Sequence, residues 1–140
     1  TGKCSKGKYS AYVQPNLVPQ GQPEATVPSN YNLITLIGKY SGRMSFFGQG
    51  AGRYPTAYNV VQDCADLLAG KGFYSPYGGK VAADNTVTRQ YYVRGGQDSW
   101  IAELTQEHWG EAVITKPIAV SEMHSWLKAH PDAFIAAIAE

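Results

Sequence analysis

The sequence predicts an α+β chain, with a small mixed or antiparallel sheet and packed helices, followed by a compact α/β appendage. Two runs rich in β-branched and aromatic residues, YNLITLIG (31–38) and GRMSFFGQ (42–49), are separated by a short turn, which is typical of a β-hairpin. A helical apolar pattern follows this hairpin. Strand and helix patterns then alternate again beyond residue 88, which predicts a second, smaller unit.

The segment before the hairpin combines a strand with a surface loop. Residues 8–18 (KYSAYVQPNLV) are rich in β-forming residues, and Pro15 is expected to interrupt the strand because proline cannot donate a ladder hydrogen bond. Residues 19–30 contain three prolines together with Gly, Gln, Ser and Asn, so they are expected to form a loop.

The helix predicted after the hairpin has one continuous apolar face. Pro55 is expected at the first helical position, where its missing N–H costs nothing, and Gly70 or Gly72 is expected to end the helix. We expect the apolar face to pack on the sheet, with Cys64 as a small core residue. The residues that recur at helical spacing are Ala57, Val60, Val61, Cys64, Leu67 and Leu68.

The patterns divide the chain into residues 1–70, a glycine-rich linker over 71–87, and a small α/β tail over 88–140. The tail is expected to contain, in order, a strand, a short helix, a second strand and two helices, over 88–95, 99–109, 111–120, 121–129 and 131–140. Its tryptophans are expected to pack in a core or an interface.

Composition excludes several classes of protein. The formal net charge is +1 and no long run of Lys or Arg occurs, which argues against a nucleic-acid partner. No apolar stretch approaches the ~20 residues that cross a bilayer, so no membrane association is expected. Cys4 and Cys64 form no CxxC motif, and free thiols in the cytoplasm are expected. The chain begins TGKCSKGK without Met, as a piece of a longer protein would.

Glycine alternates with other residues in FFGQGAGRYPTAYNVVQD (46–63), which places Gly48, Gly50 and Gly52 between a strand and a helix. Such a loop presents backbone N–H groups and the positive end of a helix to an anion or a polarised group. The GxGxG spacing differs from the GxGxxG of a dinucleotide-binding fold, and the absence of a following Gly-Lys-Ser/Thr excludes a P-loop. From the residues alone, a tight structural turn and a ligand-contacting loop are both open.

Other candidate residues form no catalytic pattern. The three histidines make no HExxH motif, and no two carboxylates are paired in a way that predicts a general acid and base. We therefore expect no catalytic residue and no metal ligand within this chain. The histidines are His108, His124 and His130.

The stretch FFGQGAGRYPTAYNVVQDCADL resembles the end of the catalytic region of homoserine dehydrogenases, in which a strand enters a G-x-GAG-x-x-PTA-x-x-VV-x-D helix. The preceding VQPNLVPQGQPEATV is similar to the family's P-x-LVP…HPLA-x-V segment, with Gln22-Pro23 where His-Pro is usual. YNLITLIGKYSGRMSFFG is similar to the following strand pair, with Asn32 at the first position of the family's N-A-V. The resemblance covers residues 8–70.

This resemblance implies the C-terminal part of an enzyme that interconverts L-aspartate 4-semialdehyde and L-homoserine with NAD(P), in threonine, methionine and isoleucine biosynthesis. It implies cofactor contact at Gly52, supported by Gly50 and Ala51, because the family's GAG loop lies at the nicotinamide end of the cofactor. The catalytic residues are expected upstream, so the chain alone is expected to be inactive. The full-length enzyme would bind the small-molecule substrate, and a cytoplasmic homodimer is expected.

The tail RQYYVRGGQDSWIAEL resembles the start of an ACT regulatory domain, in which a strand is followed by a helix. GGQDSWIAEL replaces the usual D-x-P-G-V-L turn, and the tail is shorter than an ACT domain. Amino-acid sensing and simple packing or dimerisation are both open for this tail. The alternative function of the chain is a stand-alone regulatory or dimerisation module that binds an amino acid or a protein partner.

Overall fold

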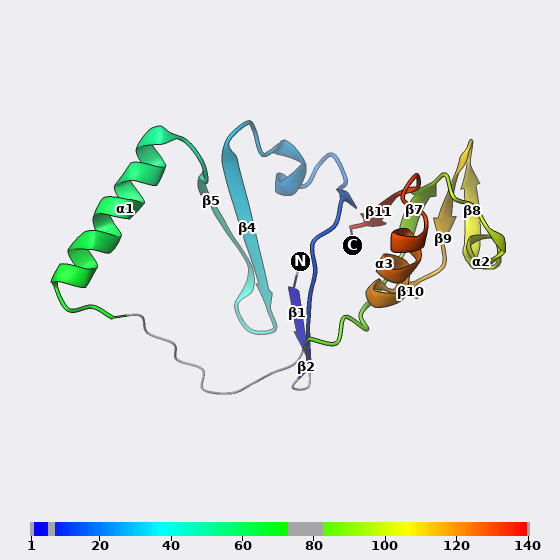
Figure 1. Cartoon of the computed structure of the whole chain (residues 1–140), viewed down its shortest axis with the longest axis horizontal. Coiled ribbons are helices and arrows are strands. Elements are labelled where there is room, and N and C mark those ends of the chain that lie inside the picture. The colour runs from blue at the N-terminus through cyan, green and yellow to red at the C-terminus, as the bar shows by residue number, and fades with distance from the viewer. Residues whose placement is uncertain (1, 6–7, 73–82, 140) are drawn as a thin grey trace. The chain divides into compact units, whose positions relative to one another are not determined.

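The computed structural model describes residues 2–5, 8–72 and 83–139, which fall into two compact units (Figure 1). Thr1–Val18 and Gly79–Glu140 form one of them, here called the terminal unit, and Pro19–Gly78 form the other, the hairpin unit. The first 18 residues thus group with the tail, whereas the predicted division placed them with the hairpin. Residues 73–82 of the predicted linker lie outside the described residues.

The predicted hairpin is confirmed in the hairpin unit. Strands β4 (Tyr31–Gly38) and β5 (Gly42–Gln49) pair antiparallel over their full length, from Tyr31 opposite Gln49 to Gly38 opposite Gly42. Gly42 has φ +67°, a conformation that glycine adopts without strain at the end of the turn. The ring of Tyr31 stacks on that of Phe47, with centroids 4.9 Å apart.

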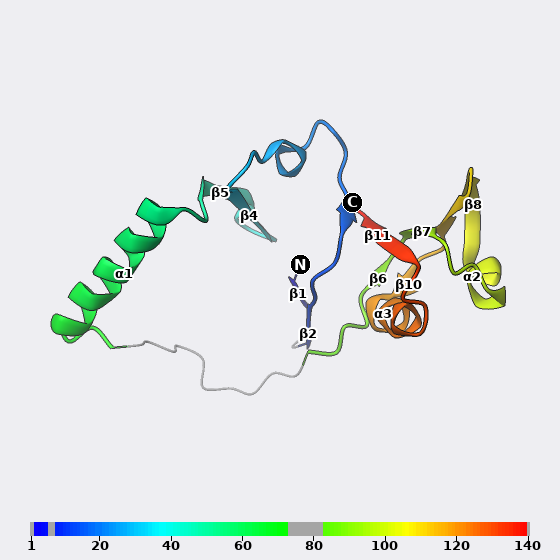
Figure 2. The same cartoon turned by 45° about the horizontal axis from the view of Figure 1, so that its top comes forward.

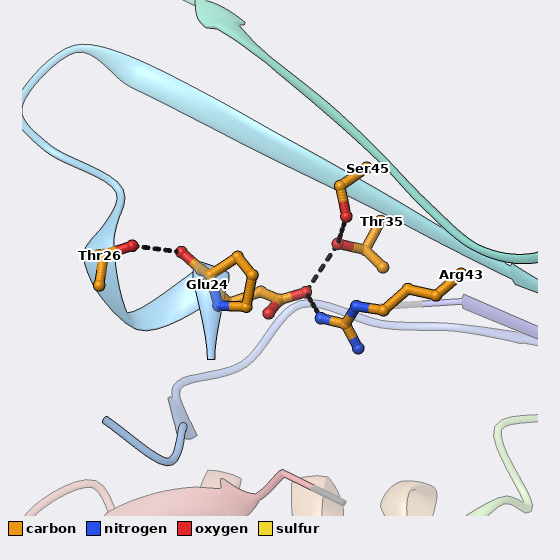
Figure 3. A network of polar contacts seen from close by, with 6 residues as sticks. Glu24, Thr26, Thr35, Arg43 and Ser45 are labelled. Carbon is orange, nitrogen blue, oxygen red and sulfur yellow. Dashed lines mark hydrogen bonds and ion pairs between the residues drawn. The ribbon is translucent and has the colours of Figure 1, made fainter. Parts of the chain in front are cut away.

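A polar network ties the short 3₁₀ helix η1 (Pro23–Thr26) to one face of this hairpin (Figure 3). The Glu24 carboxylate accepts a hydrogen bond of 2.6 Å from the Thr35 hydroxyl and forms an ion pair with Arg43. Since the single Thr35 proton points to Glu24, the Ser45 hydroxyl must donate in the 3.2 Å contact between the two hydroxyls. The Thr35 hydrogen bond is the main reason why the pKa of Glu24 is lowered.

Helix α1 (Arg53–Leu68) follows β5 and has well-defined ends. Pro55 is its third residue, not its first as predicted; proline fits there too, because none of the first four N–H groups has a partner within a helix. The predicted end at Gly70 is confirmed. Gly70 has φ +71°, and the bonds Gly70 N–H to Leu67 O (3.0 Å) and Lys71 N–H to Asp66 O (2.9 Å) form a Schellman motif.

The apolar face of α1 exists as predicted, but it is exposed within the described chain. The helix has no buried residue, and the exposed fraction is 57% for Val60 and 91% for Leu68. The prediction that Cys64 is a core residue is therefore wrong, since its thiol is free and exposed. The buried apolar side chains of the described residues all belong to the terminal unit.

The terminal unit contains a five-stranded sheet in the order β3-β11-β7-β9-β8. Strand β11 (Phe134–Ile138) lies between β7 (Tyr91–Arg94), to which it is antiparallel, and β3 (Asn16–Leu17), to which it is parallel (Figure 2). The remaining strands are β9 (Ala112–Thr115) and β8 (Thr105–Trp109). Shorter antiparallel pairs join β1 (Gly2–Ser5) to β2 (Lys8–Ala11), and β6 (Thr88–Arg89) to β10 (Ile118–Ala119).

Helices α2 (Ser99–Leu104) and α3 (Val120–Ala129) complete this unit. Without the short pieces, the element order from β7 to β11 is β-α-β-β-α-β, the ferredoxin-like order. One apolar core joins both helices to the sheet. Its members are Tyr91, Val93, Ile101, Val113, Ile118, Met123, Trp126, Ile135 and Ala137.

Two helix predictions for the tail are wrong, although the α+β fold class is confirmed. Residues 105–109 form β8 and residues 134–138 form β11. The run FIAAI contains alanines that favour helices, but pairing on both sides buries it as a central strand, where Ala136 and Ala137 are 1% and 0% exposed. Non-local strand pairing thus overrides the local preference.

A polar cluster links the extended segment after β2 to β7 and α3. Gln14 Oε1 accepts a hydrogen bond of 3.1 Å from the Tyr91 hydroxyl and lies 2.9 Å from His124 Nε2. Because an amide oxygen only accepts, His124 Nε2 must carry the proton. Burial raises the pKa of Tyr91 to about 12 and lowers that of His124.

Lowering the pH is expected to destabilise the terminal unit through His124. Its pKa lies below the ordinary value of 6.5, mainly through burial and secondarily through Lys128, so the unfolded chain takes up this proton at a higher pH than the folded chain. The contribution of neutral His124 to the free energy of unfolding is therefore complete above pH 6.5, and it declines as the pH falls below this value. Urea unfolding at several pH values should show a weaker pH dependence in His124→Gln, and an unchanged dependence would contradict this account.

Candidate functional site

The predicted glycine loop joins β5 to α1 in the hairpin unit. Gly50, Ala51 and Gly52 lie between the last residue of the strand and the first residue of the helix, and all three are exposed. Gly48 lies inside β5, opposite Asn32. The predicted cofactor-contacting residues are therefore one continuous, accessible piece of backbone.

The three alternate glycines differ in how far each position requires glycine. A Cβ atom on Gly48 would meet nothing within 4 Å, so this position tolerates a side chain. A Cβ on Gly50 would lie 1.6 Å from Asn32 Nδ2, so Asn32 would have to move. Gly52 has φ +129° and ψ 154°, a region that is essentially restricted to glycine.

Asn30, which directly precedes β4, forms two hydrogen bonds with the loop. The Gly50 N–H donates to the Asn30 backbone oxygen at 3.0 Å, and Asn30 Nδ2 donates to the Ala51 oxygen at 2.7 Å. Asn30 follows Ser29, whose φ of +44° belongs to a turn closed by Tyr31 N–H to Pro28 O at 3.0 Å. Sequence reasoning missed Asn30, because an asparagine in a proline-rich loop signals only a turn.

The N-terminal end of α1 gives the loop its electrostatic character. Gly52 is the N-cap residue, and its oxygen accepts the first helical bond from Thr56 N–H at 3.1 Å. Among the residues that the structure describes, no side chain caps the helix, and no acidic residue lies in its first turn. The first N–H groups and the positive helix end therefore remain available to a negative or polarised group.

A shallow pocket of about 390 Å³ lies on the hairpin unit, lined by Glu24, Val27 and residues 31–34. Asn32 belongs both to this lining and to the contact with Gly50.

Across the described ranges, no group of three His, Cys, Asp or Glu side chains could hold a metal ion. No helix in the part of the chain that the structure describes is both long and apolar enough to span a bilayer.

Alanine at Gly50 is expected to disturb the loop, whereas alanine at Gly48 is not. A methyl group at Gly50 would displace the exposed Asn32 side chain from its present place, and we expect a local rearrangement rather than a large loss of stability. Amide spectra of the two variants provide the measurement. Gly50→Ala should shift the side-chain amide signals of Asn32 and the loop signals, and Gly48→Ala should shift only its neighbours; equal changes would contradict the steric explanation.

Comparison with protein families concerns the segment that contains this loop. Residues 2–65 match the family model described as homoserine dehydrogenase. The homoserine dehydrogenase of Corynebacterium glutamicum is 35% identical over 86 residues, which are 61% of this chain and 18% of that protein. That of Mycobacterium leprae is 45% identical over 63 residues, 45% of this chain and 14% of that protein. The chain thus spans less than a fifth of either relative.

Two solved structures share the fold. The homoserine dehydrogenase from Thiobacillus denitrificans has a TM-score of 0.64 at 17% identity and matches 99% of this chain and 41% of its own. The S. aureus homoserine dehydrogenase has a TM-score of 0.52 at 19% identity and matches 99% of this chain and 40% of its own. At these identities the similarity concerns the fold alone.

Proposed function

We propose that this chain is the C-terminal part of a homoserine dehydrogenase, because its residues 2–65 match the model of that family. The enzyme would interconvert L-aspartate 4-semialdehyde and L-homoserine, with NAD(P) supplying or accepting the hydride. Within it, the loop 50–52 would contact the nicotinamide end of the cofactor. The catalytic residues would lie in other parts of the enzyme, so this chain alone would be inactive.

The observation that supports this proposal best is the conformation of Gly52. Its backbone angles require glycine, and it lies in the family-matched segment at the start of a 16-residue helix. The backbone of the loop is exposed at residues 50–52, so a flat ring could approach it. The uncapped N–H groups of the first turn suit a polarised carboxamide. The chain's own residues would therefore bind and orient, and would transfer no proton.

A chimeric enzyme tests this proposal. The 86 aligned residues of the C. glutamicum homoserine dehydrogenase would be replaced with those of this chain, and the parent enzyme would serve as the positive control. The chimera should oxidise homoserine with a nicotinamide dinucleotide, which is followed by dinucleotide absorbance. A folded chimera that binds no dinucleotide would contradict the proposal, as would dehydrogenase activity of this chain alone.

We also propose that the enzyme is a cytoplasmic homodimer. The exposed hairpin face carries Ile34, Leu36, Met44 and Phe46, and each of these side chains is at least 44% exposed. Within the described part of the chain the hairpin is a two-stranded sheet, so each strand also has an edge without a partner there. Apolar faces and free strand edges of this kind favour association with another copy. Sedimentation equilibrium of the chimera tests this, and a monomer at micromolar concentration would contradict it.

The alternative function, a regulatory or dimerisation module, is supported by the terminal unit. That unit has its own core and the ferredoxin-like element order, so it could bind an amino acid or a protein partner independently of the loop. Equilibrium dialysis with threonine, methionine and isoleucine would test this alternative. Binding that does not depend on a dinucleotide would support it, whereas activity of the chimera supports the enzyme.

A further inference from the structure

Asn30 contacts two consecutive residues of the glycine loop with two different groups. Its backbone oxygen accepts from Gly50 N–H at 3.0 Å, and its side-chain Nδ2 donates to the Ala51 oxygen at 2.7 Å. The side-chain bond joins residues 21 positions apart, so it connects the start of β4 to the loop after β5. A residue that served only as part of the turn would not need the side-chain bond to Ala51.

The side-chain bond fixes the direction of the next peptide group. The peptide between Ala51 and Gly52 is planar and trans, so its C=O and N–H point in opposite directions. Because the Ala51 oxygen points to Asn30, the Gly52 N–H points away from Asn30. Asn30 Nδ2 also lies 3.5 Å from the position of a Cβ on Gly52, so the side-chain amide is in van der Waals range of the residue on each side of this peptide.

We propose that Asn30 is a positioning residue of the cofactor loop: its side-chain amide sets the orientation of the Ala51–Gly52 peptide, and thereby presents the Gly52 N–H to the dinucleotide. This inference rests on the proposed function, because it concerns the same loop. It adds a residue that touches neither the ring nor the substrate, and that acts only through Ala51. Asn32 has a different part, since it occupies the space that a side chain at Gly50 would need.

The variant Asn30→Asp tests the proposal most directly. Aspartate has the same shape, but an oxygen replaces the donor that faces the Ala51 oxygen, so attraction becomes repulsion. Asn59→Asp is the matched control: it makes the same charge change on an exposed position of α1, away from the loop.

The first readout uses this chain as it is. In Asn30→Asp, the backbone amide resonances of residues 51 and 52 should shift from their positions in the parent chain, because the peptide between these residues turns, and in Asn59→Asp they should be unchanged. A structural role confined to the turn would change the amide of Tyr31, which bonds to Pro28, and leave residue 52 as it was. Unchanged amide resonances at residue 52 would overturn the proposal.

The second readout uses the chimeric enzyme. Asn30→Asp should raise the KM for the dinucleotide about 10-fold while the KM for homoserine changes less than about 2-fold, and the melting temperature should match that of Asn59→Asp. A lower kcat with unchanged KM values would overturn the positioning role, because it would indicate only loss of folded enzyme. An inactive parent chimera would contradict the proposed function instead, and the amide spectrum of this chain would still decide whether Asn30 orients the loop.

Discussion

Replacing Gly52 with alanine is expected to lower dinucleotide-dependent activity about 5- to 160-fold in the chimeric enzyme. An L-residue at φ +129° costs about 1–3 kcal/mol, so the loop would leave this conformation or the helix would lose its present start. Each 1.36 kcal/mol that the active conformation loses corresponds to about a tenfold loss in rate. Gly52→Val should be worse than Gly52→Ala, because a β-branched side chain tolerates positive φ poorly.

Steady-state kinetics of the chimera would measure this effect, with Gly48→Ala as the control. Gly48 lies in the same glycine series, has open space around it and should retain the kinetics of the parent. The effect should fall mainly on kcat/KM for the dinucleotide, while the melting temperature reports any general loss of stability. Unchanged kinetics in both Gly52 variants would remove the functional interpretation of the loop.

Replacing Trp126 with alanine should produce the largest loss of stability in the terminal unit, about 3–5 kcal/mol. Trp126 is 8% exposed and stacks on His130 at a centroid distance of 4.4 Å and on Trp100 at 6.1 Å. Its indole N–H also donates to Asp98 Oδ2 at 3.0 Å. Since small domains have a total stability of about 5–15 kcal/mol, this loss would leave the unit marginally folded.

Trp126→Phe separates packing from hydrogen bonding. The phenyl ring keeps much of the packing but removes the donor to Asp98, so we expect a loss of about 1–3 kcal/mol. Asp98 would keep its bond of 2.9 Å from the Ile101 N–H, which is the largest of the causes that lower its pKa. Urea unfolding followed by circular dichroism would measure both variants. Equal losses in the Phe and Ala variants would show that ring packing contributes little.

Local chemistry explains the parts of the fold that could be predicted. The hairpin follows from two β-rich runs and a short turn, and the end of α1 follows from Gly70, because each signal acts within a few residues. Strands β8 and β11 could not be predicted, because their conformation depends on partners distant in sequence. The side-chain exposure of α1 also could not be predicted, since periodicity identifies an apolar face but not what covers it.

In the candidate site, too, local features could be predicted from the sequence and contacts between distant residues could not. The glycine loop was recognised from its motif, and the resemblance implied a role for Gly52. Neither the motif nor the resemblance could identify Asn30, because its bond to Ala51 spans 21 residues. This bond forms only because the hairpin brings the segment before β4 next to the loop after β5. The different requirements at Gly48, Gly50 and Gly52 likewise needed backbone angles and neighbouring atoms.

The parallel pairing of β3 with β11 makes the hairpin unit an insertion within a discontinuous host domain. About 60 residues separate β3 from the remainder of the host, so host assembly must close a long loop, although the entropic cost rises only slowly with length. During synthesis, β3 emerges before the hairpin unit and can pair with β11 only after residues 134–138 have emerged. A cut between residues 18 and 79 would therefore divide one folding unit rather than separate two.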